Sequence, residues 1–109
     1  MIQYTDNMTK YYEVHVTAKD EDQANAILNA ILQKKIATGG LMFITPARFL
    51  WKEKLVDLQY FTITAFTVEK NKQAIIDEVK KVTHEDLPMI WFTEIDGNEE
   101  LLAWINEMV

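Results

Sequence analysis

The sequence predicts a single α+β domain with the element order strand, helix, strand, strand, helix, strand, followed by one further helix. Three observations predict this order. Some segments alternate apolar and polar side chains, which indicates strands, and between them lie segments with apolar residues three and four positions apart, which indicates helices. Residues 41–68 form two adjoining strand-like runs with a charged tip between them. The composition shows no linker or repeat, so we expect one domain over residues 11–109, preceded by a flexible extension over residues 1–10.

The first strand is predicted over residues 11–18, where Tyr and Val side chains alternate with more polar ones. Asp20 is expected to cap the helix that follows, and Gln23 can reach back to complete a capping box. The apolar residues of this helix share one buried face: Ala24, Ile27, Leu28, Ile31 and Leu32. We expect the helix to end near Lys35, with Gly39-Gly40 as a left-handed or flexible exit.

Residues 41–68 are predicted to form one long β-hairpin whose tip is Trp51-Lys52-Glu53-Lys54. From Tyr60 onward the second arm is aromatic, β-branched or hydroxyl-bearing, without Gly, Pro or charge, which is typical of a strand. This run alone spans about 30 Å, at roughly 3.3 Å per residue. Neither of its two faces is polar enough to be expected in contact with solvent. We therefore expect the hairpin to reach beyond its own subunit. The predicted oligomer interface comprises Trp51, Tyr60, Thr62, Thr64 and Phe66.

The second half of the chain repeats the alternation of helix and strand. A helix is expected to start near Asn71, and a loop over residues 83–88 leads to a strand over residues 89–95. The inward side chains of this helix are Ile75, Ile76, Val79 and Val82. Asn98 is a candidate cap for the last helix, and Trp104 belongs to its apolar stripe, so we expect Trp104 in the core.

This order is the split βαβ, ferredoxin-like arrangement. Two right-handed crossovers place both connecting helices on one face of an antiparallel sheet. The opposite face should therefore be free for a partner or a ligand. It carries Tyr11, His15, Thr62, Thr64 and Trp91.

Composition excludes several kinds of partner. The net charge is −6, with 17 acidic against 11 basic side chains, and the lysines are dispersed, so nucleic acid is not an expected partner. No apolar run approaches the ~20 residues of a membrane-spanning helix, so no membrane partner is expected. The absence of cysteine removes disulfides and thiolate metal sites and favours a cytoplasmic protein.

Two groups of residues are candidate metal ligands. His84, Glu85 and Asp86 offer an imidazole and two carboxylates, a ligand set that suits divalent copper or zinc. Because neighbouring residues rarely point the same way, a solvated loop is the alternative interpretation. Glu13 and His15 lie two positions apart on one strand face and can converge on an ion. A purely structural histidine is the alternative there.

No catalytic residues are assigned. The sequence contains no serine and no cysteine that could act as a nucleophile. Gly39-Gly40 precedes a predicted strand rather than a helix, so it offers no ring of helix N–H groups to a phosphate. We therefore expect a binding protein rather than an enzyme. An enzyme that uses the open sheet face is the minor alternative.

Several short motifs follow one another in an order known from one family. They are Val14–Glu21 before an alanine-rich helix, Lys35–Thr38, the hairpin tip Trp51–Leu55, Thr67, the loop His84–Pro88, Asp96–Asn98 and Leu102–Ile105. Over about residues 11–107 these motifs resemble the CutA family of divalent-cation tolerance proteins. No single motif is specific, and the resemblance depends on their order and spacing.

The resemblance implies a tight homotrimer whose long hairpins exchange contacts between subunits, a role in metal tolerance or response, and kinship of fold with the PII regulatory proteins. Gly39 stands where the family often carries a cysteine proposed to bind copper, and no other cysteine replaces it. We therefore expect copper or zinc to bind weakly if at all, mainly through His84. The alternative is a PII-like sensor that binds a small metabolite or nucleotide in inter-subunit clefts.

Overall fold

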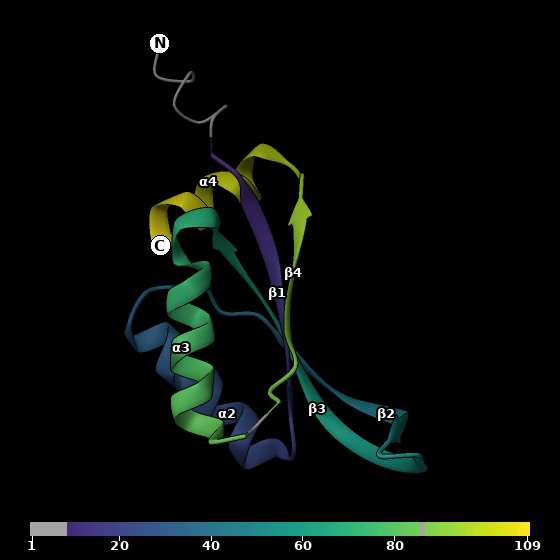
Figure 1. The fold of residues 1–109 in the computed structure, drawn as a ribbon. Coiled ribbons are helices and arrows are strands. Elements are labelled where there is room, and N and C mark those ends of the chain that lie inside the picture. The colour runs from purple at the N-terminus through teal and green to yellow at the C-terminus, as the bar shows by residue number, and fades with distance from the viewer. Residues whose placement is uncertain (1–8, 86) are drawn as a thin grey trace.

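The computed structural model describes residues 9–85 and 87–109, so Asp86 and most of the expected N-terminal extension lie outside the described residues. The predicted element order is confirmed (Figure 1). The elements are β1 (Tyr11–Ala18), α2 (Glu21–Gln33), β2 (Leu41–Trp51), β3 (Lys54–Val68), a 3-10 turn (Glu69–Asn71), α3 (Lys72–Thr83), β4 (Ile90–Ile95) and α4 (Glu99–Met108).

The four strands form one antiparallel sheet in the order β2-β3-β1-β4. Helices α2 and α3 pack against each other on one face of this sheet (Figure 1). The side chains between them are buried: Val14, Val16, Ile63 and Ala65 from the sheet, and Ala24, Ile27, Ile31, Ile75 and Val79 from the helices. Each of the larger side chains contributes about 1.5–3 kcal/mol through burial. This core confirms the predicted ferredoxin-like arrangement.

The start of α2 follows its sequence signals closely, but its end does not. The Asp20 carboxylate accepts a hydrogen bond from the Gln23 N–H at 2.8 Å. Gln23 Oε1 accepts in turn from the N–H of Lys19, also at 2.8 Å, one residue earlier than in a standard capping box. After α2 the left-handed residue is Lys35, with φ 56°, and neither of the two following glycines has a positive φ. Of the two expected forms of the glycine exit, left-handed or flexible, the left-handed one was therefore wrong.

A buried hydroxyl joins the middle of the sheet to the connection between α2 and β2. Thr67 is fully buried, and its hydroxyl donates to the carbonyl of Ile36 at 2.7 Å. The N–H of Thr38 donates to the carbonyl of Phe66 at 2.9 Å nearby. Because buried polar groups are costly without a partner, this pairing holds the connection against β3.

The hairpin of β2 and β3 is longer than the helices that cover the sheet. Its pairing runs without interruption from Leu41 opposite Thr64 to Trp51 opposite Lys54. The two-residue loop is Lys52-Glu53, with φ 50° and 67°, which is the left-handed pair of a type I′ turn. Figure 1 shows the distal part of the hairpin extending away from α2 and α3. Large apolar side chains there are exposed, with Leu55 at 75%.

The last helix, α4, covers one end of the sheet face that α2 and α3 leave open. Tyr11 and Ile105 are buried there together with Val68, so the expectation that Tyr11 lies on an uncovered face was wrong. Trp104 was also expected in the core, and it is 42% exposed. The buried side of α4 is formed by Leu101, Leu102, Ile105 and Val109. At 3.6 residues per turn, Trp104 lies roughly 120° around the helix from the centre of that side.

Candidate functional site

A large pocket lies between the hairpin and the loop that follows α3. Its volume is about 750 Å³, which is within the usual range of roughly 300–1,000 Å³ for small-molecule sites. We call it the hairpin pocket. Its lining residues are Thr17, Phe49, Leu50, Trp51, Val56, Leu58, Tyr60, His84, Glu85, Leu87 and Met89.

The hairpin contributes an aromatic wall to this pocket. Tyr60 on β3 pairs with Thr45 on β2, and paired residues point to the same face of the sheet. Side chains alternate along a strand, so Phe49 and Trp51, four and six residues after Thr45, lie on that face too. The rings of Phe49 and Tyr60 meet edge to face, with centroids 6.1 Å apart. Trp51 is 51% exposed, and the ammonium group of Lys52 lies 5.7 Å from the centroid of its ring.

The end of α3 contributes the polar wall. His84 takes the left-handed conformation that ends the helix, with φ 54°, and its N–H donates to the carbonyl of Lys80 at 3.0 Å. The N–H of Glu85 donates to the Thr83 hydroxyl at 3.3 Å. Both residues line the pocket. The structure thus brings two of the three predicted metal ligands of the loop beside Trp51 and Tyr60, which the sequence had suggested only as interface residues.

These side chains do not form a complete metal site in the single chain. Among residues 9–85 and 87–109, no group of three or more His, Asp or Glu side chains is placed to hold an ion. The third predicted ligand of the loop, Asp86, lies outside the described residues. A structural zinc site takes four ligands and a catalytic one three. An imidazole and a carboxylate at one pocket rim therefore fit a weak divalent site and not a tight one.

The second predicted metal pair lies on the open sheet face, and neither of its residues lines this pocket. His15 Nε2 is 3.1 Å from Glu13 Oε1, and the imidazole stacks on the Trp91 indole with centroids 4.9 Å apart. The hydroxyls of Thr64 and Thr93 lie 3.4 and 3.5 Å from the two ring nitrogens. Each nitrogen of His15 therefore has a neighbour within the chain. Sequence reasoning placed Trp91 on this face but did not identify it as the stacking partner of His15.

The other predicted interface residues are already sheltered within the chain. Thr62 and Thr64 are each 5% exposed, and the Thr45 hydroxyl donates to the Thr62 hydroxyl at 2.6 Å. Phe66 packs against the cluster beneath α4. Most of the exposed large apolar side chains lie instead along the hairpin, from Leu41 to Leu58. The interface role of all five residues stays a prediction.

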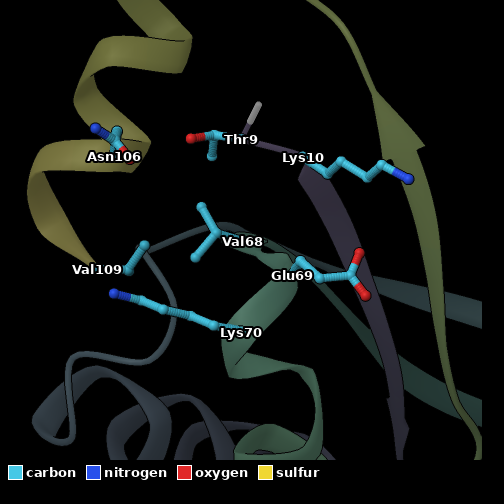
Figure 2. Close-up of a pocket in the computed structure, with 7 residues that line it drawn as sticks. All are labelled: Thr9, Lys10, Val68, Glu69, Lys70, Asn106 and Val109. Atoms are coloured by element: carbon cyan, nitrogen blue, oxygen red, sulfur yellow. The ribbon is translucent and has the colours of Figure 1, made fainter. Parts of the chain in front are cut away.

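A second pocket, of about 460 Å³, lies near the C-terminal end of α4 (Figure 2). Its lining residues are Thr9, Lys10, Val68, Glu69, Lys70, Asn106 and Val109. Figure 2 shows the Lys70 side chain extending towards Val109, whereas Glu69 points to the opposite side. The lining charges are of both signs, so the pocket selects neither anions nor cations by charge.

A hydrogen-bonded pair beside this pocket joins β1 to the turn before α3. The Tyr12 hydroxyl donates to Glu69 Oε1 at 2.6 Å, and Lys72 Nζ lies 3.8 Å from the centroid of the Tyr12 ring. The hydrogen bond to Glu69 raises the pKa of Tyr12 to about 12. The same bond lowers the pKa of the Glu69 carboxyl below its ordinary value. Lys72 Nζ also lies 3.8 Å from Glu69 Oε2, so these contacts join β1, the turn and the first residue of α3.

Within the part of the chain that the structure describes, none of the helices combines the length and apolar character needed to cross a membrane.

Known proteins share both the sequence pattern and the fold. The family model for the CutA1 divalent ion tolerance protein matches residues 12–108. A divalent-cation tolerance protein CutA from Archaeoglobus fulgidus is 29% identical over 97 residues, which is 88% of this chain and 95% of the relative. The solved structure of the periplasmic divalent cation tolerance protein CutA from the same organism superposes with a TM-score of 0.86 at 27% identity, over 90% of this chain and 97% of that one.

A further solved structure supports the same fold at lower sequence similarity. The divalent ion tolerance protein CutA1 from Ehrlichia chaffeensis superposes with a TM-score of 0.84 at 17% identity, over 93% of this chain and 96% of that one. The family match extends from β1 to the end of α4 and includes both the hairpin and the loop that carries His84. The chain belongs to the CutA1 divalent ion tolerance protein family.

Proposed function

We propose that this protein is a homotrimeric binding protein, not an enzyme, that takes part in the response to divalent metal ions. The family match over residues 12–108 carries the proposal, since relatives with this fold are named for divalent-cation tolerance. The hairpin pocket agrees with it, because a histidine and a carboxylate share its rim with the exposed hairpin tip.

The ion in this proposal binds weakly at His84 and Glu85. Copper(II) and zinc accept an imidazole nitrogen and a carboxylate oxygen. Copper(I) prefers sulfur, and the chain has no cysteine to offer it. With two described donors, the expected dissociation constant is on the order of micromolar or weaker.

Self-assembly is the second part of the proposal. The hairpin exposes Leu41, Phe43, Ile44, Leu50 and Leu55 together with Trp51. The alternation along β2 places Phe43 and Trp51 on one face of the hairpin and Leu50 on the other, so both faces expose large apolar side chains. Monomeric proteins rarely leave this much apolar surface in water. The sheet also ends in two edge strands, β2 and β4, whose free backbone groups are available for pairing with another chain. These features support an assembly built around the hairpin.

The metal part is tested by calorimetric titration of the full chain with zinc and with copper(II). His84→Asn is the informative variant, because asparagine tolerates the positive φ of this position better than alanine does. We expect binding to weaken by about ten-fold or more in this variant, since one of two donors is lost. His15→Gln is the matched control and should leave binding unchanged. Nanomolar affinity, or affinity that survives His84→Asn, would contradict the proposal.

We propose the cytoplasm as the compartment, since a chain without cysteine needs no oxidising environment. Cell fractionation checks this, and recovery of the native protein with a periplasmic marker would contradict it. The Archaeoglobus fulgidus relative is described as periplasmic, so the result also shows whether the two proteins share a compartment.

A further inference from the structure

Helix α4 presents an exposed apolar surface that is separate from the hairpin. Trp104 and Met108 lie four residues apart, so they are neighbours on one side of the helix, and they are 42% and 48% exposed. Glu100 lies one turn before Trp104 on the same side, Glu107 lies beside it, and both are exposed. We call these four residues the α4 stripe. Two large apolar side chains and two carboxylates thus share one outward side of the helix.

The carboxylates of the α4 stripe lack a cationic partner among the described ion pairs. Glu100 Oε1 accepts a hydrogen bond from Asn98 Nδ2 at 3.0 Å, and this bond lowers the pKa of the Glu100 carboxyl. The ion pairs of residues 9–85 and 87–109 include none with Glu100 or Glu107. The sequence of α4 contains no lysine or arginine. A surface that fits the stripe therefore combines apolar side chains with positive charge.

The hairpin tip has this complementary character. Trp51 pairs with Lys54 across the two strands, so both side chains emerge on the same face. Trp51 is 51% exposed, and no ion pair of the described residues involves Lys52 or Lys54. The tip has two lysines and one glutamate, Glu53, so it is positive in a chain whose net charge is −6. It offers a ring and ammonium groups where the stripe offers apolar side chains and carboxylates.

The two surfaces do not meet within one chain. Figure 1 shows α4 beside the upper ends of β1 and β4, whereas the tip of β2 and β3 lies at the lower right. Two different surfaces of one chain that fit each other make a heterologous contact between copies, and such contacts form a ring when the rotation between copies closes. A ring of three copies, the assembly proposed above, occupies the tip and the stripe of every copy.

We propose that the hairpin tip of one copy docks on the α4 stripe of the next copy. Trp51 packs against the two apolar side chains of the stripe, and the ammonium groups of Lys52 and Lys54 pair with its two carboxylates. The inference rests on the proposed homotrimer and names the two surfaces that join its subunits. Because Trp51 is the central anchor and contacts two apolar side chains, losing Trp104 alone weakens the contact less than losing Trp51.

Charge reversal tests the pairing. Lys52→Glu together with Lys54→Glu should raise the protein concentration at half assembly by about ten-fold or more, because like charges then meet. Glu100→Lys together with Glu107→Lys should do the same from the other side. The chain with all four substitutions restores opposite charges and should assemble within about three-fold of the native concentration.

Sedimentation velocity over a dilution series measures the assembly of each full-length variant. Lys19→Glu together with Lys80→Glu is the matched control for the tip, since it changes the net charge equally on exposed lysines, and its effect should stay below about two-fold. Tip reversal no more harmful than the control would overturn the proposal, as would a four-substitution chain that assembles no better than either pair. A native chain that stays monomeric would instead refute the proposed homotrimer, and this contact with it.

Cross-linking locates the contact directly, because the chain has no cysteine of its own. A chain carrying both Lys54→Cys and Glu107→Cys, treated with a short bis-maleimide, should give a covalent three-chain product, since each copy is joined to two neighbours. Either substitution alone should join no more than two chains. Native-like assembly of the doubly substituted chain without a three-chain product would place the tip on another surface and overturn the proposal.

Discussion

Two adjacent glycines at the start of the hairpin have different structural roles. A Cβ added to Gly40 would lie 1.8 Å from the carbonyl oxygen of Thr64, whereas one added to Gly39 would meet nothing within 4 Å. Gly40 is therefore required because two backbone segments approach closely there. Gly39 is free of that constraint.

Gly40→Ala should lower the free energy of unfolding by about 2–4 kcal/mol, because backbone and not a flexible side chain has to move. Gly39→Ala is the matched control and should change it by less than about 1 kcal/mol. Denaturant titration at one fixed protein concentration measures both. Equal effects of the two substitutions would show that the close approach to Thr64 does not govern this position.

The hairpin tip places two residues with side chains where glycine or asparagine is preferred. Lys52 and Glu53 both have positive φ. Glu53→Gly should raise the free energy of unfolding by about 0.5–1 kcal/mol, because it relieves the left-handed strain. Lys54→Gly, in the adjoining strand, should lower it by a similar amount. A loss of stability in Glu53→Gly as large as that in Lys54→Gly would contradict this account of the tip.

At the scale of the elements, one hydrogen bond joins β1 to the turn before α3 and makes stability depend on pH. The folded state raises the pKa of Tyr12 from 10.0 to about 12, so its contribution is complete below pH 10 and is lost as the pH rises towards 12. The folded state lowers the pKa of Glu69 from 4.5, so that contribution is present above this value and is lost as the pH falls.

Tyr12→Phe removes the hydroxyl and keeps the ring that packs under Lys72. Its stability should therefore be lower than that of the native chain at pH 8 and should approach it between pH 10 and 12. Thermal unfolding of both proteins at each pH gives the difference in their stability. Lysine titration affects both proteins equally, so it cancels in that difference. A difference that is constant up to pH 12 would show that the bond to Glu69 does not couple to pH.

The order of the elements was predictable because local signals agreed with the fold. Asp20 caps α2 as expected, and the alternation in β1 matches most of its buried residues. The signals failed where neighbours decide the outcome. From the sequence, both Trp104 and Ile105 are candidate core residues. The position of α4 over the open sheet face decides that Ile105 is buried and Trp104 is not. Likewise, no local pattern indicates that Lys35 replaces glycine at the exit of α2.

The candidate site was predictable only in pieces. The sequence identified His84 and Glu85 as candidate ligands and Trp51 and Tyr60 as candidate interface residues. That all four line one pocket depends on where the long hairpin lies in the fold, which no local pattern indicates. Phe49, Leu87 and Met89 carried no functional signal at all. Their contribution depends on contacts between segments more than 20 residues apart in sequence.

At the scale of the whole molecule, the exposed hairpin is the proposed site of assembly. Trp51 and Trp104 are both about half exposed in the single chain, so they form a matched pair. Trp51→Ala should shift the assembly towards monomer by about ten-fold or more, because buried aromatic residues dominate interfaces. Trp104→Ala should have a smaller effect. Light scattering after size exclusion measures both, and equal shifts would mean that the hairpin tip has no special role.

The central claim is that the hairpin pocket holds the divalent ion of this CutA-family protein. The most direct test is anomalous diffraction at the zinc absorption edge from crystals of the full chain equilibrated with zinc. The account predicts an anomalous peak beside the His84 imidazole, within the pocket that Trp51 and Tyr60 line. A peak at Glu13 and His15 instead, or no peak beside His84 at saturating zinc, would contradict it.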